Sequence, residues 1–188
     1  ALAVIAMASH GGFLNAPDVY MDKIAVGGGL PNQVVDIDNS IEKNIKNLAD
    51  AKNVTPADIV VCILDRPRHK DIISGVRESG ARIMLISDGD VSGVIATAQP
   101  DAGVDLYLGS GGAPEGVLAA AALRCIGGQM QGRLMFRNDD EISRARRWGI
   151  EDLEKKYCLS ELAKGDVMFA ATGVTAGTML KGGKRFPG

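Results

Sequence analysis

The sequence predicts an α/β protein in which a largely parallel sheet is layered between helices. A unit of strand, polar turn and helix occurs three times between residues 59 and 125. The first strand of the series, residues 59–64, is a continuous apolar run of the kind that is buried on both faces of a parallel sheet. Because such alternation is typical of βαβ units, we expect a layered α/β sandwich.

Composition supports one soluble domain spanning residues 1–188. Hydrophobic residues make up 46% and charged residues 23% of the chain, which is ordinary for a globular protein. The net charge of −2 gives no basic footprint. We therefore expect neither nucleic acid nor a membrane surface as a partner.

The cysteines point to a reducing compartment. Cys62, Cys125 and Cys158 are odd in number and have no CxxC spacing. Cys62 lies in an apolar run and Cys125 on an apolar helix face, so we expect buried, reduced thiols and a cytoplasmic location.

The first half of the chain contains two strands and one surface helix. Residues 1–8 are apolar, too short to span a membrane and without the basic start of a signal peptide, so they predict a buried strand. A chain rarely begins inside a core strand, and we expect further sequence before Ala1. Residues 20–26 alternate as a second strand. Asn39 with Glu42 resembles a capping box for an amphipathic helix.

The three repeated units follow a single capped turn at residues 55–58. Each combines an apolar strand with a polar or glycine-rich segment and then a helix; the strands are residues 59–64, 82–86 and 104–108, and the helices follow to Gly80, Ala98 and Cys125. Beyond them we expect a strand within residues 129–137, a charged peripheral helix over 139–156, and a last buried strand at 166–171. Residues 172–177 would repeat the strand-then-glycine pattern a fourth time.

Two arginines follow the first strand of the series. In open parallel sheets, ligands bind beyond the carboxyl ends of the strands. Pro67 stiffens the turn between Arg66 and Arg68, whose guanidinium groups could grip one phosphate. Two surface arginines at a helix start are the alternative, but positive charge is unfavourable at that end of the helix dipole. A bound anion is the better explanation.

The glycine-rich residues 109–116 predict a second anion seat. Free N–H groups and the dipole of the following helix attract an anion, and Pro114 suits the first helical turn. Glu115 places a carboxylate in this same turn. A metal ion beside a phosphate would reconcile the two; the alternative is that Glu115 only favours a helix N-terminus.

Two carboxylates follow the second strand of the series. Asp88 and Asp90, across Gly89, could bind a cation, accept hydrogen bonds from sugar hydroxyls, or cap the next helix. Hydroxyl recognition is favoured, because only one further carboxylate, Glu115, would join them as a metal ligand. The phenol of Tyr20 either packs or reaches a phosphate.

No nucleophilic triad is indicated. His10 lies in a turn, and His69 lies in the arginine loop, where it supports the phosphate site or has no functional role. The residues alone indicate a site for a sugar phosphate or nucleotide phosphate, with or without a divalent metal, and leave the reaction open.

Five motifs together resemble the class II fructose-1,6-bisphosphatases over essentially the whole chain. They are NAPDVYMDK at 15–23, DRPRH at 65–69, LISDGDV at 85–91, GGAPEG at 111–116 and FAATGV at 169–174. The resemblance implies the layered sandwich of the sugar phosphatases related to inositol monophosphatase. It also implies metal-dependent hydrolysis, with Mg²⁺ or Mn²⁺, of the 1-phosphate of fructose 1,6-bisphosphate to fructose 6-phosphate in gluconeogenesis. Some members also accept sedoheptulose 1,7-bisphosphate.

The motifs carry the family's site residues onto this chain. Glu115 would be a metal ligand, and the ion would polarise the phosphoryl group and activate water. The sugar bisphosphate would contact Tyr20, Arg66, Pro67, Arg68, Asp88, Gly89, Asp90 and Gly112. The family's Gly-Glu-Gly-Glu and Asp-Pro-x-Glu-Gly-Thr motifs are absent, so we expect an internal portion that is inactive alone. We also expect a homo-oligomer.

Three rival functions belong to other classes. A non-catalytic sugar-phosphate-binding domain would bind without metal dependence. A sugar-phosphate isomerase would need a Glu or His base near the substrate carbon. An inositol-type monophosphatase is less favoured, because two arginines suit a second phosphate.

Overall fold

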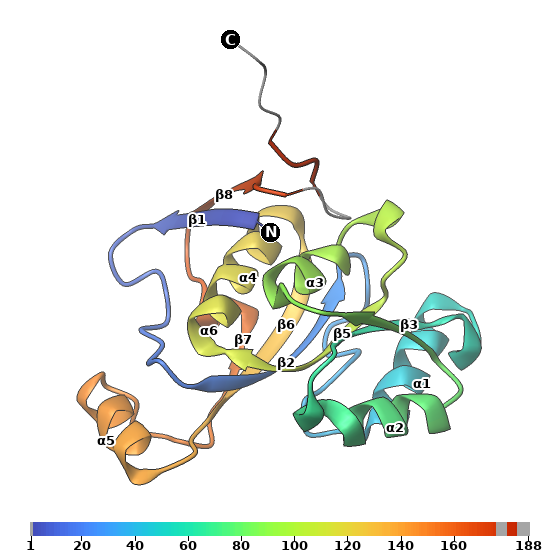
Figure 1. Ribbon diagram of the computed structural model, residues 1–188, viewed down its shortest axis with the longest axis horizontal. Coiled ribbons are helices and arrows are strands. Elements are labelled where there is room, and N and C mark those ends of the chain that lie inside the picture. Colours follow the sequence, from blue (N-terminus) through green and yellow to red (C-terminus); the bar gives the residue numbers. More distant parts are fainter. Residues whose placement is uncertain (1, 176–179, 184–188) are drawn as a thin grey trace.

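The computed structural model describes residues 2–175 and 180–183, and it confirms the layered α/β sandwich. A six-stranded sheet lies at its centre in the order β4-β3-β5-β2-β6-β7 (Figure 1). In chain order, its strands are β2 Tyr20–Gly27, β3 Val60–Leu64, β4 Arg82–Ile86, β5 Leu106–Gly112, β6 Gly128–Met135 and β7 Lys156–Cys158.

Most strands of this sheet point the same way. Strands β4, β3 and β5 are mutually parallel, while β2 pairs antiparallel with both β5 and β6. Strand β6 therefore shares the direction of β5, and only β2 and β7 run against the others. The predicted parallel character is confirmed for the repeated βαβ units. Of the two exceptions, β2 inserts between β5 and β6, which come later in the chain, and β7 pairs antiparallel with β6 at the edge of the sheet.

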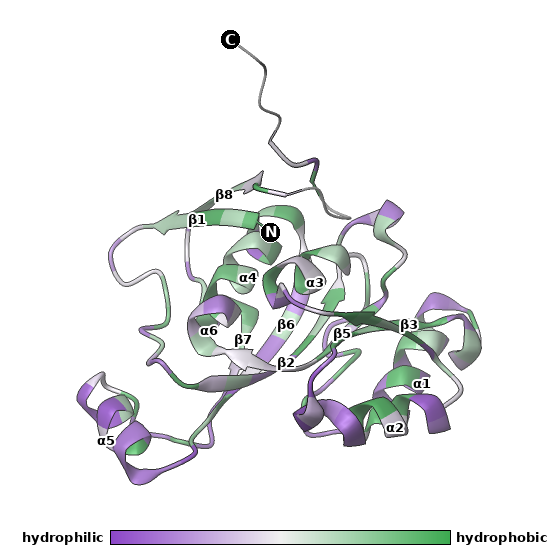
Figure 2. Ribbon diagram, in the orientation of Figure 1, coloured by the Kyte–Doolittle hydropathy of each residue, from purple (hydrophilic) through white to green (hydrophobic). Residues whose placement is uncertain are grey.

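Helices cover both faces of the sheet. Helices α1 (Ile41–Lys52) and α2 (Lys70–Glu78) lie on one face, where Ile45 and Leu48 are fully buried. Helices α3 (Asp90–Ala96), α4 (Ala113–Ile126) and α6 (Leu159–Leu162) lie on the other (Figure 1). Figure 2 shows that α1 and α2 each combine hydrophobic and hydrophilic residues. Amphipathic spacing in the sequence therefore sets which side of each helix faces the core.

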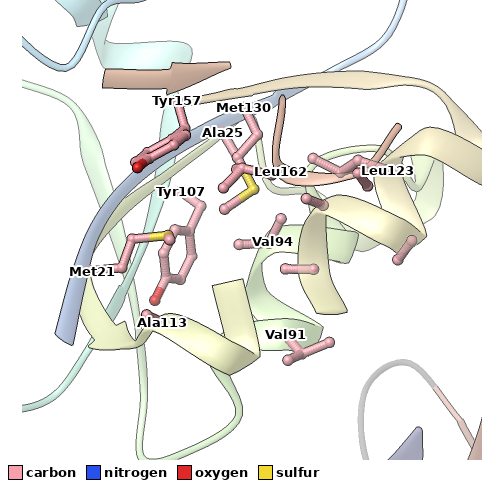
Figure 3. Close-up of a cluster of buried hydrophobic side chains, with 14 of the residues drawn as sticks. Met21, Ala25, Val91, Val94, Tyr107, Ala113, Leu123, Met130, Tyr157 and Leu162 are labelled. Carbon is pink, nitrogen blue, oxygen red and sulfur yellow. The ribbon is translucent and has the colours of Figure 1, made fainter. Parts of the chain in front are cut away.

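The core beneath α3 and α4 uses small and flexible side chains. Figure 3 shows Met21 and Tyr107 from the sheet, Val94 of α3 and Leu123 of α4 as members of one cluster of buried apolar side chains. The alanines of α4 are buried, which lets this helix approach the sheet closely. Because α3 and α4 start at the edge where β4 and β5 end, this packing fixes that edge of the sheet.

The first and last strands form a separate two-stranded sheet. Strand β1 (Leu2–Ala8) pairs antiparallel with β8 (Val167–Gly173), and both contact α4 (Figure 1). The prediction that both strands are buried was wrong. A ribbon covered on one side alternates in exposure, and Ile5, Met7 and Met168 are each more than half exposed. The fourth strand-then-glycine unit therefore does not belong to the central sheet, and its residues 176–177 lie outside the described residues.

Several local predictions need correction. Ser40, not Asn39, caps α1, since its hydroxyl accepts the Lys43 N–H. The apolar run at residues 82–86, which predicts a buried strand, forms the edge strand β4, where Leu85 is 44% exposed. Cys125 and Cys158 are exposed, so only Cys62 is a buried thiol. Burial raises the pKa of Cys62 to about 11.

The remaining elements are short. The predicted turn at 55–58 is confirmed as η1 (Pro56–Asp58), which Thr55 and Asp58 close as a capping box. The charged helix α5 (Asp139–Arg147) is peripheral but ends earlier than predicted, before Gly149 with its φ of 87°. The other two turns are η2 (Pro67–His69) and η3 (Pro100–Ala102). Among the described residues, no helix has the length and apolar character that a membrane crossing requires.

Candidate active site

The predicted site residues gather in one cleft at an edge of the central sheet. Strands β3, β4 and β5 end there and β2 begins there. The cleft has a volume of about 950 Å³. Every predicted site residue except Pro67 lines it: Tyr20, Arg66, Arg68, Asp88, Gly89, Asp90, Gly112 and Glu115. Pro67 instead begins the short η2 turn.

The glycine-rich stretch differs from the predicted turn. Its first four residues continue β5, because β2 pairs with them as far as Tyr20 opposite Gly112, and α4 begins at Ala113. A Cβ atom at Gly112 would collide with the Glu115 carboxylate, and one at Gly111 would lie 2.5 Å from Asp90 Oδ2. These glycines therefore make room for carboxylates at the floor of the cleft.

Arg68 is held in a fixed orientation. Its guanidinium donates to the Ser110 carbonyl oxygen at 2.7 Å and to the Ser110 hydroxyl at 3.1 Å. It also lies 4.9 Å from the centre of the Tyr20 ring, a cation–π distance. Tyr20 thus packs against Arg68 while it lines the cleft.

His69 links the arginine loop to β5. It is 1% exposed, its Nε2 accepts the Ser110 N–H at 2.9 Å, and its Nδ1 lies 2.8 Å from the Leu64 carbonyl oxygen. An acceptor at Nε2 leaves the proton on Nδ1, which therefore donates to Leu64. His69 supports the position of Ser110, and through it that of Arg68.

Arg66 and Asp88 are placed differently. The Asp88 side chain is 93% exposed, and its Oδ1 lies 4.0 Å from an Arg66 guanidinium nitrogen. Gly89, with a φ of 87°, precedes α3 and offers no side-chain cap. Capping therefore does not account for Asp88. Both side chains line the cleft, and neighbouring protein groups neutralise their charges only weakly.

Asp90 lies deeper and is paired with a residue that sequence reasoning missed. Its Oδ1 accepts the Val91 N–H at 3.0 Å, and its Oδ2 accepts a hydrogen bond from Lys23 Nζ. Lys23 is 2% exposed. Burial lowers the pKa of Lys23, and the Asp90 charge opposes this shift. A single lysine inside the apolar alternation of β2 was the only signal in the sequence.

Asp22, the neighbour of Lys23, lies on the opposite face of β2. Burial raises the pKa of its carboxyl group, while the positive charges of Arg133 and Lys23 act in the opposite direction. Neither Asp22 nor Lys23 lines the cleft.

The donor set for a metal is incomplete within this chain. No group of three His, Cys, Asp or Glu residues in the described part of the chain is arranged to hold a metal ion. Glu115 lines the cleft in the first turn of α4 and offers one carboxylate. One carboxylate fits a single coordination position of Mg²⁺ or Mn²⁺, not the whole site.

The arrangement suits a phosphorylated polyol. Arg66 and Arg68 supply positive charge, and the N-terminus of α4 adds the favourable end of a helix dipole. Asp88 lies just before α3 and Asp90 begins it. Their carboxylate oxygens can accept hydrogen bonds from the hydroxyl groups of a ligand. The cleft therefore offers groups that could bind an anion and groups that could accept hydrogen bonds from hydroxyls.

Comparison with known proteins gives relatives along the whole chain. A protein of Trichodesmium erythraeum named D-fructose 1,6-bisphosphatase class 2/sedoheptulose 1,7-bisphosphatase is 42% identical, over 99% of this chain and 57% of its own length. A protein of the same name from Crocosphaera subtropica is 40% identical, over 100% of this chain and 58% of its own length. The chain thus spans less than two thirds of the curated relatives it matches.

A family model described as bacterial fructose-1,6-bisphosphatase, glpX-encoded, matches residues 1–188. The match covers the strands, the arginine loop and the glycine-rich stretch that build the cleft. With these relatives and this match, the chain belongs to the bacterial class 2 fructose-1,6-bisphosphatase family.

Proposed function

We propose that the protein, at its natural length, hydrolyses the 1-phosphate of fructose 1,6-bisphosphate to give fructose 6-phosphate and phosphate. The observation that carries this proposal is the single cleft that brings two arginines and two aspartates together at the sheet edge. The names of the relatives support it, since they include this activity. A phosphate and several hydroxyls on one small substrate match these two sets of groups.

The residues take separate roles in this proposal. Arg66 and Arg68 bind a phosphate of the substrate, and Pro67 stiffens the turn between them. Asp88 and Asp90 accept hydrogen bonds from sugar hydroxyls, with Gly89 shaping their loop. The backbone of Gly112 approaches the substrate, and Tyr20 contacts it while packing on Arg68. The immobility of Arg68 favours one substrate orientation.

We also propose that the natural-length protein needs Mg²⁺ or Mn²⁺, with Glu115 as one ligand. The described residues do not complete such a site, and the phosphoryl-transfer step does not follow from them. The 188-residue chain alone is accordingly expected to release no phosphate. Measured turnover by the isolated chain would overturn this part of the proposal.

A second substrate is favoured by the comparisons. The relatives carry sedoheptulose 1,7-bisphosphatase in their names, and we propose the seven-carbon bisphosphate as an alternative substrate. Both sugars would offer the same groups to the arginines and the aspartates. We further propose that the protein is a homo-oligomer. We also propose a cytoplasmic location, which is in keeping with its three free cysteines.

The test is a phosphate-release assay of the natural-length protein with fructose 1,6-bisphosphate and Mn²⁺. We expect equal amounts of phosphate and fructose 6-phosphate. An isomeric bisphosphate without free phosphate would indicate an isomerase instead. Calorimetry showing binding that does not depend on Mn²⁺, with no turnover, would indicate a sugar-phosphate-binding domain.

A further inference from the structure

We propose that Lys23 is a positioning residue that holds the Asp90 carboxylate in place at the floor of the cleft. Asp90 lines the cleft, whereas Lys23 lies behind it and does not. This role deepens the proposed function, because it concerns how one of the proposed hydroxyl acceptors is fixed. The position of Asp90 can also be measured without turnover.

The geometry places the lysine beneath the aspartate. Lys23 lies on β2 opposite Gly109 of β5, and its Nζ donates to Asp90 Oδ2 at the start of α3. The side chains of Lys23 and Asp90 are 1% and 11% exposed. Lys23 is therefore out of reach of a substrate, while the Asp90 carboxylate keeps a small exposed surface toward the cleft.

Other groups near Asp90 do not replace this contact. Within the described residues, the remaining hydrogen bond to its carboxylate comes from the Val91 N–H next to it in the chain. The Tyr107 hydroxyl is buried nearby but has no hydrogen-bond partner in the part of the chain that the structure describes. Lys23 is thus the side chain that ties Asp90 to the central sheet.

Two glycines make room for the pair. A Cβ atom at Gly111 would lie 2.5 Å from Asp90 Oδ2 and 3.2 Å from Lys23 Nζ. A Cβ atom at Gly116 would lie 3.2 Å from Lys23 Cε. The glycine-rich stretch of β5 and α4 therefore has a second use besides backbone access to a ligand: it accommodates the Lys23–Asp90 ion pair.

Removal of the lysine charge has a definite physical consequence. A buried carboxylate that loses its counter-charge is strongly unfavourable, whereas removal of both charges is often tolerated. In a Lys23→Met variant, Asp90 would turn toward solvent or take up a proton. Either change alters the acceptor that the sugar is proposed to meet.

The kinetic test is a double-mutant cycle in the natural-length protein with fructose 1,6-bisphosphate. We expect Lys23→Met to raise KM about tenfold with a smaller change in kcat, Asp90→Asn to do the same, and the double variant to be no worse than Asp90→Asn. Lys52→Met is the matched control, because Lys52 pairs with Asp105 at the opposite end of β5. An unchanged KM in Lys23→Met, or multiplied effects in the double variant, would overturn the proposal.

A second readout does not depend on turnover. Amide hydrogen exchange over residues 87–92 should be faster in Lys23→Met than in wild type and unchanged in Lys52→Met. This result would support the positioning role even if wild type released no phosphate, which would refute the proposed function alone. Unchanged exchange would contradict the role. If Lys23→Met does not fold, the KM and the exchange of the double variant must match those of Asp90→Asn.

Discussion

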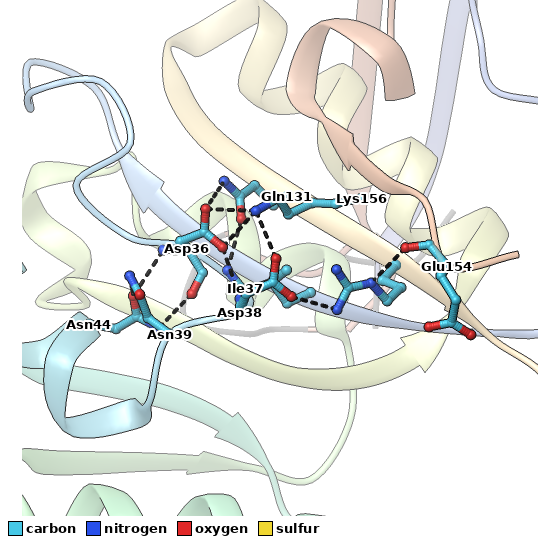
Figure 4. Close-up of polar contacts among 9 residues, drawn as sticks. Asp36, Ile37, Asp38, Asn39, Asn44, Gln131, Glu154 and Lys156 are labelled. Atoms are coloured by element: carbon cyan, nitrogen blue, oxygen red, sulfur yellow. Dashed lines mark hydrogen bonds and ion pairs between the residues drawn. The ribbon is translucent and has the colours of Figure 1, made fainter. Parts of the chain in front are cut away.

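Two polar networks on the central sheet differ in how their charges are matched. In the first, shown in Figure 4, Lys156 Nζ lies 2.8 Å from Asp36 and 2.9 Å from Asp38, and Arg133 lies 2.7 Å from Asp38. In the cleft, Arg66 and Asp88 approach only to 4.0 Å. Glu115 forms no hydrogen bond or ion pair with any residue that the structure describes.

The difference separates structural charge from charge that awaits a ligand. Asp36 also accepts from Gln131 and its backbone contacts Asn44, so the first network fastens the loop before α1 to β6 and β7. Its charges neutralise one another. The cleft instead holds Arg68 rigid through the uncharged Ser110. Asp90 is paired with Lys23, but among the described residues the charges of Arg66, Arg68 and Asp88 have no counter-charge closer than 4.0 Å. Unneutralised side chains on a rigid frame are what a binding site requires.

The largest effect is expected at Glu115. Glu115→Gln keeps the shape of the side chain and removes its charge. Loss of a group that supports a metal ligand typically lowers metal affinity or activity ten- to hundredfold, and loss of the proposed ligand itself should lower activity further. We expect kcat/KM of the natural-length protein to fall by about a hundredfold or more. The control is Asp38→Asn in the first network, the one shown in Figure 4, which should leave kcat/KM nearly unchanged. Equal losses of kcat/KM in Glu115→Gln and Asp38→Asn would contradict the proposed difference between the two networks.

A smaller effect is expected at Arg68. Arg68→Lys keeps the charge but loses the planar fork that meets Ser110 and Tyr20. Loss of a charge-assisted hydrogen bond of about 2 kcal/mol corresponds to a KM increase of roughly thirtyfold. Steady-state kinetics measure it, with Arg133→Lys as the control outside the cleft. A thirtyfold increase in the control as well would show that the effect is not specific to the site.

The smallest effect is expected on the stability of the protein at low pH, through Asp38 in the first network. Hydrogen bonds from Arg133 and then Lys156 lower the pKa of Asp38 from 3.8 to about 2. A lowered folded-state pKa gives stability that is present above the unfolded value and lost as pH falls through the folded value. The contribution should therefore disappear between pH 3.8 and about 2.

Urea unfolding of Arg133→Met at several pH values measures this contribution. The variant should be less stable than wild type above pH 4, and the difference should shrink toward pH 2. Arg124→Met is the control, because Arg124 donates to the Gly165 carbonyl oxygen, a group that does not titrate. A wild-type-minus-variant difference that is the same at all pH values would refute the assignment.

The sequence predicts the contents of the cleft well because chain order and strand direction decide them. Once residues 59–64, 82–86 and 104–108 are taken as parallel strands, the segments after them must meet at one edge. Arg66, Asp88 and Glu115 then lie together without knowledge of any side-chain contact. The structure agrees, since all three line the same cleft.

Features that depend on tertiary pairing were not predictable in this way. The apolar runs of β1 and β8 look like those of central strands, but their burial depends on how many neighbours each strand finds. The Lys23–Asp90 pair joins residues 67 positions apart, and no local sequence pattern predicts that these two residues pair. Both cases show that burial of a residue type is a property of the assembled layers.

We propose that Arg66 and Arg68 bind phosphate while Asp88 and Asp90 bind sugar hydroxyls. A crystal structure of the natural-length protein with fructose 6-phosphate tests it most directly. We expect the phosphate within hydrogen-bond distance of the two guanidinium groups and sugar hydroxyls within hydrogen-bond distance of the two aspartates. A sugar phosphate bound outside this cleft, or bound within it without contact to either arginine, would contradict it.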